Sequence, residues 1–559
     1  MSLATQTDTL RSRLNYEPRV LEFGTSGRRG KVVDLTQLEV YINATAELEY
    51  LQSPDTAVGG IVRGEEFFFA RDLRLSSDRF VPDEDGRGEI AQAIVAAIRD
   101  AGMAPINLGT IPTPALTCYA LARGKGSMMV TGSHIPFDRN GYKTNSSKGE
   151  LRKEQEAPIN DQVRRVRERV YAQDGNQSAF DQHGMFKAGH QELPVEHPEA
   201  RAAWIERFTS FFKGSSFNGK RILVDQQSAV GRDLLVEVLE RMNAKVIAAG
   251  RSDTFVPIDT ENIGAPQLAT IQALAADATA KHGPIHAIVS TDGDSDRPLI
   301  LGVDPATGKA HFFGGDLVGM VVAEYLKADA VVVPISCNDA VDRGNLKSVV
   351  EPKTRIGSPF VIAGMEEARR SGKKRICGWE PNGGFLTGSD IERNGAVLPA
   401  LLTRDAILPI LGVLFAADES GVSVVDLFER LPKRFSRAAL LENFPKALGL
   451  KLVAFFSSGT DDNAADHRQT GLEEIRQRLA RFFTREMGFG TITHVDYTDG
   501  VRILFDNGDV AHVRPSGNAD ELRIYAVADT QARADAIAAM GVAEPNGILR
   551  CMERATANA

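Results

Sequence analysis

The sequence predicts a multidomain α/β protein that ends in a smaller α+β domain. Three observations lead to this prediction. The chain has 559 residues, short apolar runs alternate with longer helical patterns along most of it, and its last stretch instead shows short strands joined by a tight turn. One hydrophobic core rarely organises more than about 250–300 residues, so roughly three to five domains are expected.

The alternation of short and long patterns is clearest in the middle of the chain. An apolar run at 221–225 is followed by a helical pattern at 232–242 and a second apolar run at 244–248. Similar runs occur at 287–290 and 330–334. Parallel strands buried on both faces are typically continuous apolar runs of this kind. The pattern therefore predicts repeated βα units.

The last stretch of the chain has a different character. Strands are predicted at 501–505, 510–513 and 522–527, with a helix at 530–540. The tetrapeptide DNGD at 506–509 is a strong hairpin signal between the first two strands. This order indicates an α+β cap.

Two further segments help to divide the chain. Residues 171–197 are rich in Gly, Gln, His and Asp, which indicates an irregular insertion or an excursion that carries a hairpin. A helix is predicted at 204–212. Domain boundaries are expected near 214, near 314 and between 432 and 452.

The composition limits the classes of partner. Hydrophobic residues make up 43% and charged residues 25%, as in ordinary globular proteins. The net charge of -9 argues against a nucleic-acid partner, although a local basic pocket can still bind an anion. None of the four cysteines has CxxC spacing, so neither a zinc site nor a disulfide framework is expected. The N-terminal segment has no apolar core typical of a signal peptide, and no apolar run reaches about 18 residues. We therefore expect a cytoplasmic protein with no membrane partner.

The first motif that carries chemistry is TGSHIPFDRNGYK at 131–143. A short strand at 128–130 leads into it, and Gly132 is expected to let the chain turn so that Ser133 is presented at the strand's carboxyl end. Loops at this edge of an α/β sheet form ligand sites. A serine hydroxyl needs a nearby base or cation to act as a nucleophile. His134 and Lys143 are close enough in sequence to supply that help.

The second motif is TDGDSDRP at 291–298. Asp292, Asp294 and Asp296 directly follow a predicted strand, so their carboxylates can converge on one cation. Ligand sets made only of oxygen favour Mg²⁺. Gly293 is expected to let the backbone bend around the ion, and Arg297 to offset charge or to hold a phosphate bidentately. An EF-hand is excluded, because its glycine and its final glutamate are missing.

The third motif, GWEPNGGF at 378–385, follows another short strand. Its carboxylate and amide suit sugar hydroxyls, and its glycines let the loop approach a ligand closely. The candidate substrate-binding residues here are Glu380, Asn382 and Gly383.

Two more motifs are typical of anion sites. RPSGNADELRIY at 514–525 combines two arginines with a turn whose backbone amides can form a nest for phosphate. FGTSGRRG at 23–30 combines three glycines, two hydroxyls and two arginines. No GxxxxGK[ST] motif occurs in the chain, so a nucleotide-binding P-loop is excluded.

Taken in this order, the five motifs resemble the α-D-phosphohexomutase superfamily, the phosphoglucomutases and phosphomannomutases. Weaker similarities at 67–77, 109–116 and 354–365 extend the resemblance over nearly the whole chain. The resemblance implies three related mixed-sheet α/β domains and a smaller C-terminal α+β domain around a central cleft. The domains would span 1–213, 214–314, 315–445 and 446–559.

The resemblance also implies a role for each candidate residue. Ser133 would carry a phosphate and would bind Mg²⁺ together with the three aspartates. His134, Lys143 and Arg29 would complete the catalytic group, and Arg297 would join the sugar loop in binding substrate. The distal phosphate site would consist of Arg514, Ser516, Gly517, Asn518 and Arg523.

The implied activity is that of a phosphohexomutase, an isomerase and phosphotransferase of carbohydrate metabolism. It would interconvert hexose 1-phosphate and hexose 6-phosphate, with a hexose 1,6-bisphosphate as intermediate and activator. The alternative is a glucose-1,6-bisphosphate synthase that uses a donor such as fructose 1,6-bisphosphate. The sequence leaves the preferred hexose and the oligomeric state open.

The sequence departs from the family pattern where substrate is recognised. The sugar loop has Glu380-Pro381-Asn382-Gly383-Gly384 where Glu-x-Ser-Gly is usual, and the distal loop has Asn518-Ala519-Asp520 in place of the threonine and its neighbour. Ile135 stands where asparagine is frequent in the serine loop. These differences motivate the synthase alternative, because looser retention of the bisphosphate would release it.

Overall fold

The structure is a computed structural model that describes residues 8–24, 26–54, 59–261, 263–457, 473–516 and 520–557. It divides into two compact units, one of Met1–Phe312 with Asn382–Val424 and the other of Phe313–Pro381 with Val425–Ala559. The predicted fold class is confirmed: mixed-sheet α/β parts precede a smaller C-terminal α+β part. The bounds of the four predicted domains and the shared cleft stay predictions. No helix in the described ranges is both long and apolar enough to cross a membrane.

The first sheet of the first unit contains six strands in the order β1-β7-β6-β2-β5, with β8 paired to β7. β2, β5 and β6 run parallel, whereas β7 is antiparallel to both of its main neighbours. The strands are β1 (Arg28–Lys31), β2 (Glu66–Arg71), β5 (Ala104–Thr110), β6 (Ser127–Val130), β7 (Arg139–Ser146) and β8 (Gly149–Glu150).

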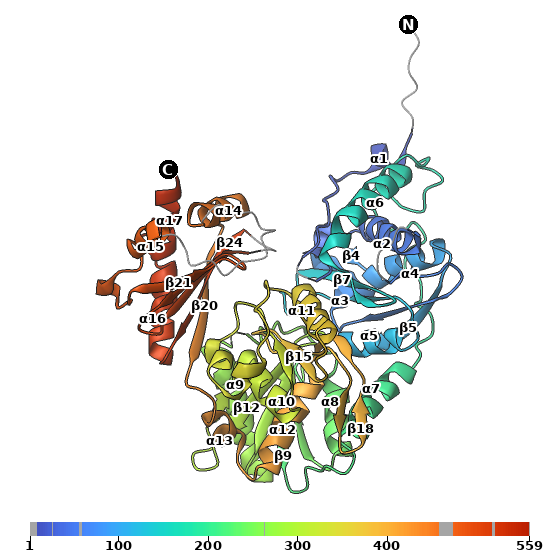
Figure 1. The fold of residues 1–559 in the computed structure, drawn as a ribbon. Coiled ribbons are helices and arrows are strands. Elements are labelled where there is room, and N and C mark those ends of the chain that lie inside the picture. Colours follow the sequence, from blue (N-terminus) through green and yellow to red (C-terminus); the bar gives the residue numbers. More distant parts are fainter. Residues whose placement is uncertain are drawn as a thin grey trace. The chain divides into compact units, whose positions relative to one another are not determined.

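Helices cover both faces of this sheet because its strands are apolar on both sides. Phe67 and Phe69 of β2 lie in a core with residues of α2 (Gln37–Gln52) and α4 (Ile90–Asp100). The side chain of Phe68, which lies between them on β2, packs against Tyr119 of α5, with the ring centroids 5.4 Å apart. Successive side chains of a strand point to opposite faces, so the sheet lies between two helical layers. The remaining helices of this part are α5 (Thr113–Leu121) and α6 (Lys153–Tyr171), and Figure 1 shows α6 beside α2.

The second sheet has the order β10-β9-β11-β12-β13, with its first three strands parallel and the last two antiparallel. The predicted strand at 221–225 matches β9, and the prediction at 244–248 is one residue early for β10. The elements are β9 (Arg221–Asp225), α8 (Arg232–Arg241), β10 (Lys245–Ala249), α9 (Ala265–His282), β11 (Ala287–Thr291), β12 (Pro298–Val303) and β13 (Ala310–Phe312).

The predicted irregular segment lies between α6 and α7 (Glu199–Phe211). Its residues 172–198, all described, contain isolated bridges but no regular helix or strand. Phe180 nevertheless packs into a core with α2 and α6, so the segment is anchored. α7 begins five residues before the predicted start at Trp204, directly after Pro198.

The last segment of the first unit returns after residue 381. It contains β16 (Phe385–Thr387), β17 (Ile391–Arg393), β18 (Ala396–Leu398), β19 (Leu401–Asp405) and α12 (Ile407–Glu419). Phe415 of α12 stacks on Phe212 and Phe217, with ring centroids 4.8 and 3.9 Å apart. These contacts hold the segment against the earlier part of the unit.

The second unit begins with β14 (Ala330–Val332) parallel to β15 (Ile376–Trp379), flanked by α10 (Gly315–Tyr325) and α11 (Ser358–Arg370). Its C-terminal sheet is antiparallel throughout, in the order β20-β24-β23-β22-β21, with helices α16 and α17 beside it (Figure 1). The predicted strand at 501–505 matches β22, and Gly508 takes a positive φ of 85° in the predicted hairpin. The elements are β20 (Phe435–Glu442), α14 (Lys446–Phe455), α15 (Glu473–Ala480), β21 (Ile492–Asp496), β22 (Val501–Phe505), β23 (Val510–Pro515), β24 (Glu521–Ala528), α16 (Gln531–Val542) and α17 (Ile548–Ala557).

Candidate active site

The serine loop connects β6 to β7 at the carboxyl end of β6. Ser133 is fully buried and has a φ of 53°, in the left-handed region that non-glycine residues rarely adopt. Its backbone N–H donates to Thr131 Oγ1 over 2.8 Å. The turn was expected at Gly132, but the positive φ belongs to Ser133 itself. Such backbone strain concentrates at functional sites.

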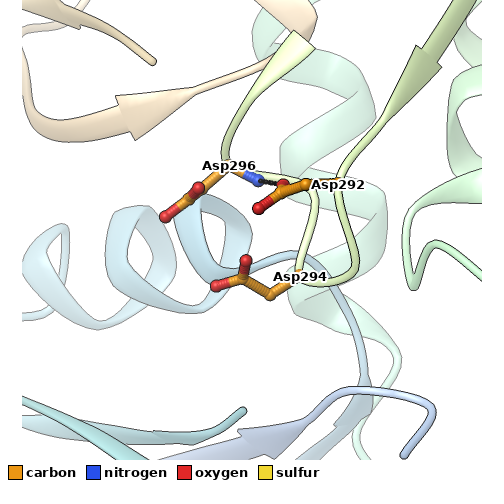
Figure 2. A group of neighbouring side chains, drawn as sticks. All are labelled: Asp292, Asp294 and Asp296. Carbon is orange, nitrogen blue, oxygen red and sulfur yellow. Dashed lines mark hydrogen bonds between the residues drawn. The ribbon is translucent and has the colours of Figure 1, made fainter. Parts of the chain in front are cut away.

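The metal loop connects β11 to β12 and carries the three predicted aspartates. All three side chains are buried, and one carboxylate oxygen from each lies within 4.8 Å of the other two. Figure 2 shows the carboxylates turned toward a common centre, with the Asp296 N–H donating to Asp292 Oδ1 over 3.2 Å. The alternation in sequence therefore gives the predicted convergence.

The serine and metal loops touch directly. Ser133 Oγ donates to Asp292 Oδ2 over 2.9 Å. A Cβ atom on Gly293 would lie 2.6 Å from the Ser133 carbonyl oxygen. Gly293 is therefore needed for this close approach, whereas the left-handed turn of the metal loop is made by Ser295 at a φ of 56°.

The aspartate cluster fits a hard divalent cation. Asp294 Oδ1 and Asp296 Oδ1 are buried and lack a hydrogen-bond partner. A buried carboxylate oxygen without a partner is costly unless a cation binds it. The available ligands are oxygens only, which favours Mg²⁺ over softer metals.

Three side chains from other elements contact the outer oxygens of the cluster. Lys143 Nζ on β7 donates to Asp294 Oδ2 at 2.6 Å and to Asp296 Oδ2 at 2.8 Å. Arg404 on β19 donates to Asp296 Oδ2 through Nε at 3.1 Å and lies within 2.9 Å through Nη2. Thr113 at the start of α5 donates to Asp294 Oδ2 over 2.6 Å. The inner oxygens of these two aspartates are therefore left for a metal.

The three carboxyl groups have different pKa values. Burial, followed by the negative charges of Asp294 and Asp296, raises the pKa of Asp292 well above its usual range. Burial also opposes ionisation of the other two carboxyls. Lys143 nevertheless lowers the pKa of Asp294, and Arg404 lowers that of Asp296. Ionisation of all three together requires more positive charge, which a divalent cation provides.

His134 is a neutral acceptor in this geometry. Its Nδ1 lies 3.3 Å from Ser133 Oγ and 3.0 Å from Arg297 Nη1. A guanidinium can only donate, so Nδ1 carries no proton. Burial and the charges of Arg297 and Arg29 lower the pKa of His134 far below its usual value.

Arg29 belongs to the same group of charges. Burial and Arg297 lower its pKa to about 10, so its guanidinium is still charged at neutral pH. Its Nε is buried without a partner. Lys143 and Arg404 are bonded to the aspartates, whereas the charges of Arg29 and Arg297 act on His134 beside Ser133. The two arginines suit a phosphate group at the serine.

The predicted sugar-binding residues fall on both sides of the division between the units. Glu380 directly follows β15 in the second unit and is buried, with 3% of its surface exposed. Asn382 belongs to the first unit, where its carbonyl accepts from Thr260 Oγ1 over 2.7 Å and its Oδ1 accepts from the Gly384 N–H over 3.0 Å. Gly383 has a φ of 88°. Asn382 and Gly383 therefore form a tight turn whose backbone depends on glycine.

The predicted distal phosphate residues lie in the second unit. Arg514 on β23 and Arg523 on β24 are direct cross-strand partners. Asp499 accepts from Arg514 Nε over 2.9 Å, and Glu521 accepts from Arg523 over 2.8 Å. Like charges opposite each other are unfavourable, so the pair is typical of an anion site. Ser516 is buried beside them, while Gly517 and Asn518 lie outside the described residues.

The sequence analysis missed Arg404 and Thr113. Arg404 is a single arginine within a short strand, and no local pattern connects it with Asp296, which lies 108 positions earlier. Thr113 lies in the Pro-Thr-Pro segment that carried part of the resemblance, but its contact with Asp294 is visible only in the structure.

Comparison with family models matches three segments of the chain. Residues 20–170 match "Phosphoglucomutase/phosphomannomutase, alpha/beta/alpha domain I", residues 314–435 match domain III, and residues 464–544 match the C-terminal domain. The aspartate loop lies between the first two matches.

Several known proteins are similar to the chain over nearly its full length. A phosphomannomutase of Sinorhizobium fredii is 36% identical, covering 94% of this chain and 98% of the relative, and one of Salmonella muenchen is 35% identical, covering 91% and 92%. Among solved structures, a putative phosphomannomutase of Thermus thermophilus has a TM-score of 0.62 at 19% identity, covering 93% and 98% of the two chains. A Burkholderia thailandensis protein of the phosphoglucomutase/phosphomannomutase family has a TM-score of 0.61 at 16% identity, covering 95% and 97%. The two solved structures support the fold.

Proposed function

Because this chain belongs to the phosphoglucomutase/phosphomannomutase family, we propose that it interconverts hexose 1-phosphate and hexose 6-phosphate through a phosphoserine at Ser133 and a hexose 1,6-bisphosphate intermediate. Membership makes the chain a phosphotransferase that acts on phosphosugars. The observation that carries the proposal is the hydrogen bond between Ser133 Oγ and Asp292, because it joins a hydroxyl to the carboxylate cluster.

The proposed transfer exchanges one phosphoester bond for another. The sugar hydroxyl attacks the phosphorus of phosphoserine and gives its proton to a base. The bond from phosphorus to Ser133 Oγ breaks, and Oγ takes up a proton to become a hydroxyl again. We assign proton transfer and charge stabilisation to His134, whose Nδ1 lies 3.3 Å from Ser133 Oγ, and to Lys143, which donates to Asp294 in the adjoining metal loop. Arg29 and Arg297 offset the charge of the phosphoryl group. Positioning and electrostatics supply most of the rate in such transfers.

The proposed cofactor is Mg²⁺, held by Asp292, Asp294 and Asp296 together with a phosphoserine oxygen. When bound, it neutralises charge on the transferring phosphoryl group. Lys143, Arg404 and Thr113 hold the outer oxygens of two of these aspartates, so the inner oxygens face the ion in a fixed orientation.

The proposed second phosphate site explains how the substrate can react at either end. Glu380, Asn382 and Gly383 would bind sugar hydroxyls. The distal phosphate would be held by Arg514, Ser516, Gly517, Asn518 and Arg523. The bisphosphate intermediate would turn over, so that each of its two phosphates in turn reaches Ser133.

We propose mannose phosphate as the preferred substrate. Two relatives above 30% identity are named phosphomannomutases, and each aligns over more than nine tenths of this chain. The cytoplasmic location and the lack of a nucleic-acid partner stay predictions.

The test is a ³¹P NMR assay of the purified protein with mannose 1-phosphate or glucose 1-phosphate, Mg²⁺ and a hexose 1,6-bisphosphate primer. We expect the 6-phosphate to appear, faster from mannose 1-phosphate, and the conversion to stop when EDTA removes the metal. No conversion of either sugar would reject the mutase. A bisphosphate that accumulates when fructose 1,6-bisphosphate is the donor would favour the synthase.

A further inference from the structure

Arg74 holds the backbone of the serine loop. It lies just after β2, at the N-terminal end of the short helix α3 (Leu75–Asp78), and its side chain is 1% exposed. Its Nη1 donates to the carbonyls of Pro136 and Arg139 at 2.7 and 2.8 Å. Its Nη2 donates to the carbonyls of Ser133 and Ile135 at 2.9 and 2.5 Å. One guanidinium therefore binds four carbonyls of the loop that carries the reactive serine.

Asp72 is connected to the backbone N–H of the same serine through Thr131. Its Oδ2 accepts from Thr131 Oγ1 over 2.8 Å, and Thr131 Oγ1 in turn accepts from the Ser133 N–H over 2.8 Å. The Asp72 carboxylate also lies 3.4 Å from Arg74 Nε. Both the N–H and the carbonyl of Ser133 are thus fixed by one connected network.

The network is closely packed around the backbone of the serine loop. A Cβ atom on Gly132 would lie 2.7 Å from Arg74 Cζ, so this glycine allows the guanidinium to lie flat against the loop. Arg74 Cζ also lies 3.7 Å from the centre of the Phe255 ring. The same ring would be 2.9 Å from a Cβ on Gly293 in the metal loop. The arginine is therefore enclosed between the serine loop and a segment that borders the metal loop.

We propose that Asp72, Arg74 and Thr131 form a serine-loop clasp that holds Ser133 in its left-handed conformation with Oγ directed at Asp292. A non-glycine residue persists in this conformation only when its surroundings over-determine it. The four carbonyl bonds and the bond to Thr131 do so here. Arg74 is a positioning residue, because it contacts the loop backbone and acts on the reaction through Ser133. The inference rests on the proposed function of Ser133 as phosphate carrier.

Loss of the clasp has a specific kinetic signature. A displaced Ser133 Oγ slows phosphoryl transfer in both directions, since misplacement of a reacting atom by about 1 Å can cost on the order of 100-fold in rate. The distal and sugar-binding residues are not part of the clasp, so the KM for sugar phosphate should change little. A mainly structural arginine would lower thermal stability without separating kcat from KM.

Arg87 is a matched control in the same unit. It is also buried, at 7% exposure, and its guanidinium lies over an aromatic ring, that of Tyr16, at 5.1 Å. Its Nη1 donates to the His183 carbonyl. Tyr16 and His183 both lie outside residues 131–143. Arg87→Lys therefore reproduces the cost of altering a buried arginine without altering the clasp.

The experiment compares Arg74→Lys, Thr131→Val and Arg87→Lys with the wild type in steady-state turnover and in a rapid-quench measurement of phosphorylation at residue 133 by a hexose 1,6-bisphosphate. We expect Arg74→Lys to slow both rates by about 100-fold, with KM within about threefold. Thr131→Val, which keeps the side-chain shape, should slow both by about tenfold. Arg87→Lys should leave both rates within about twofold of the wild type, whatever its melting temperature.

Two results would overturn the clasp. One is a phosphorylation rate within threefold of the wild type in Arg74→Lys and in Thr131→Val. The other is an equal loss of rate in Arg87→Lys. Thr131→Val decides the matter if Arg74→Lys does not fold. As a further check, added guanidinium ion should raise the rate of Arg74→Ala but not that of Arg87→Ala. A wild-type protein that takes no phosphate at Ser133 would reject the proposed function instead, so the two failures are distinguishable.

Discussion

Replacement of Lys143 by methionine should destabilise the metal loop in a way that depends on Mg²⁺. Lys143 Nζ lies within 2.8 Å of carboxylate oxygens of both Asp294 and Asp296, and it is 5% exposed. Methionine keeps much of the length and volume of the side chain but removes the charge. The variant therefore leaves two buried carboxylates facing each other, with Arg404 still paired to one of them.

The size of the effect follows from the burial of the pair. Removal of one partner of a buried ion pair costs about 3–5 kcal/mol. We therefore expect the free energy of local opening at residues 291–297 to fall by about that amount in EDTA. The positive charge of the ammonium group repels Mg²⁺ in the wild type, so its removal should let Mg²⁺ bind more tightly, while Thr113 and Arg404 still orient the two aspartates. At saturating metal, each tenfold gain in Mg²⁺ affinity reduces the difference in opening free energy between the variant and the wild type by about 1.4 kcal/mol.

The assay is native-state hydrogen exchange of peptides that cover the metal loop, in EDTA and in Mg²⁺. Lys353→Met is the matched control, because Lys353 is also largely buried and pairs with Asp342 over 2.6 Å, in the other unit. The loss of opening free energy in Lys353→Met, measured on peptides around residue 353, should be the same in EDTA and in Mg²⁺. The reasoning fails if Lys143→Met loses less than about 1 kcal/mol in EDTA, or if Mg²⁺ leaves its deficit unchanged.

Three further predictions test other parts of the account. Arg404→Met should lower Mg²⁺ affinity or turnover by about 10–100-fold, because Asp296 loses a group that orients it. Calorimetry measures the affinity and the mutase assay measures the turnover. An unchanged affinity and an unchanged rate would contradict the prediction. Arg523→Met should raise the KM for the sugar phosphate by a larger factor than it lowers the rate at which saturating bisphosphate phosphorylates Ser133. A larger loss in the phosphorylation rate than in KM would place the distal phosphate elsewhere. Burial raises the pKa of Asp225 to about 6 from 3.8, so its ionisation opposes folding increasingly as the pH rises from about 4 to 6. Asp225→Asn should therefore be more stable than the wild type at pH 7, by at most about 3 kcal/mol in denaturant unfolding, and should lose this advantage near pH 4; an advantage independent of pH would contradict the assignment.

The sequence predicted those parts of the site that are contiguous in the chain. Asp292, Asp294 and Asp296 follow one strand at alternate positions, so their convergence depends only on a local loop. Ser133 and Lys143 lie in one motif, in the loop after β6 and on the adjacent strand β7, and each contacts an aspartate of the metal loop. The fold class was predictable for the same reason, since apolar periodicity is a local property.

Contacts that depend on tertiary structure were not predictable in this way. Arg404 meets Asp296 only because the chain returns to the first unit after residue 381. The reasons for two glycines also differed from expectation. Gly132 and Gly293 allow close backbone approach to Arg74 and to Ser133, while the left-handed turns belong to Ser133 and Ser295. A sequence shows that a glycine is present, but the neighbour that requires it comes from elsewhere in the fold.

The most direct test of the account is the intact mass of the protein after incubation with mannose 1,6-bisphosphate and Mg²⁺, followed by localisation of the modification. The account predicts one added phosphoryl group per chain, on Ser133, which is lost again when excess mannose 1-phosphate or mannose 6-phosphate is added. Ser133→Ala should gain no mass and should have no mutase activity. Full activity in Ser133→Ala, or a phosphoryl group carried by another residue, would contradict the central claim.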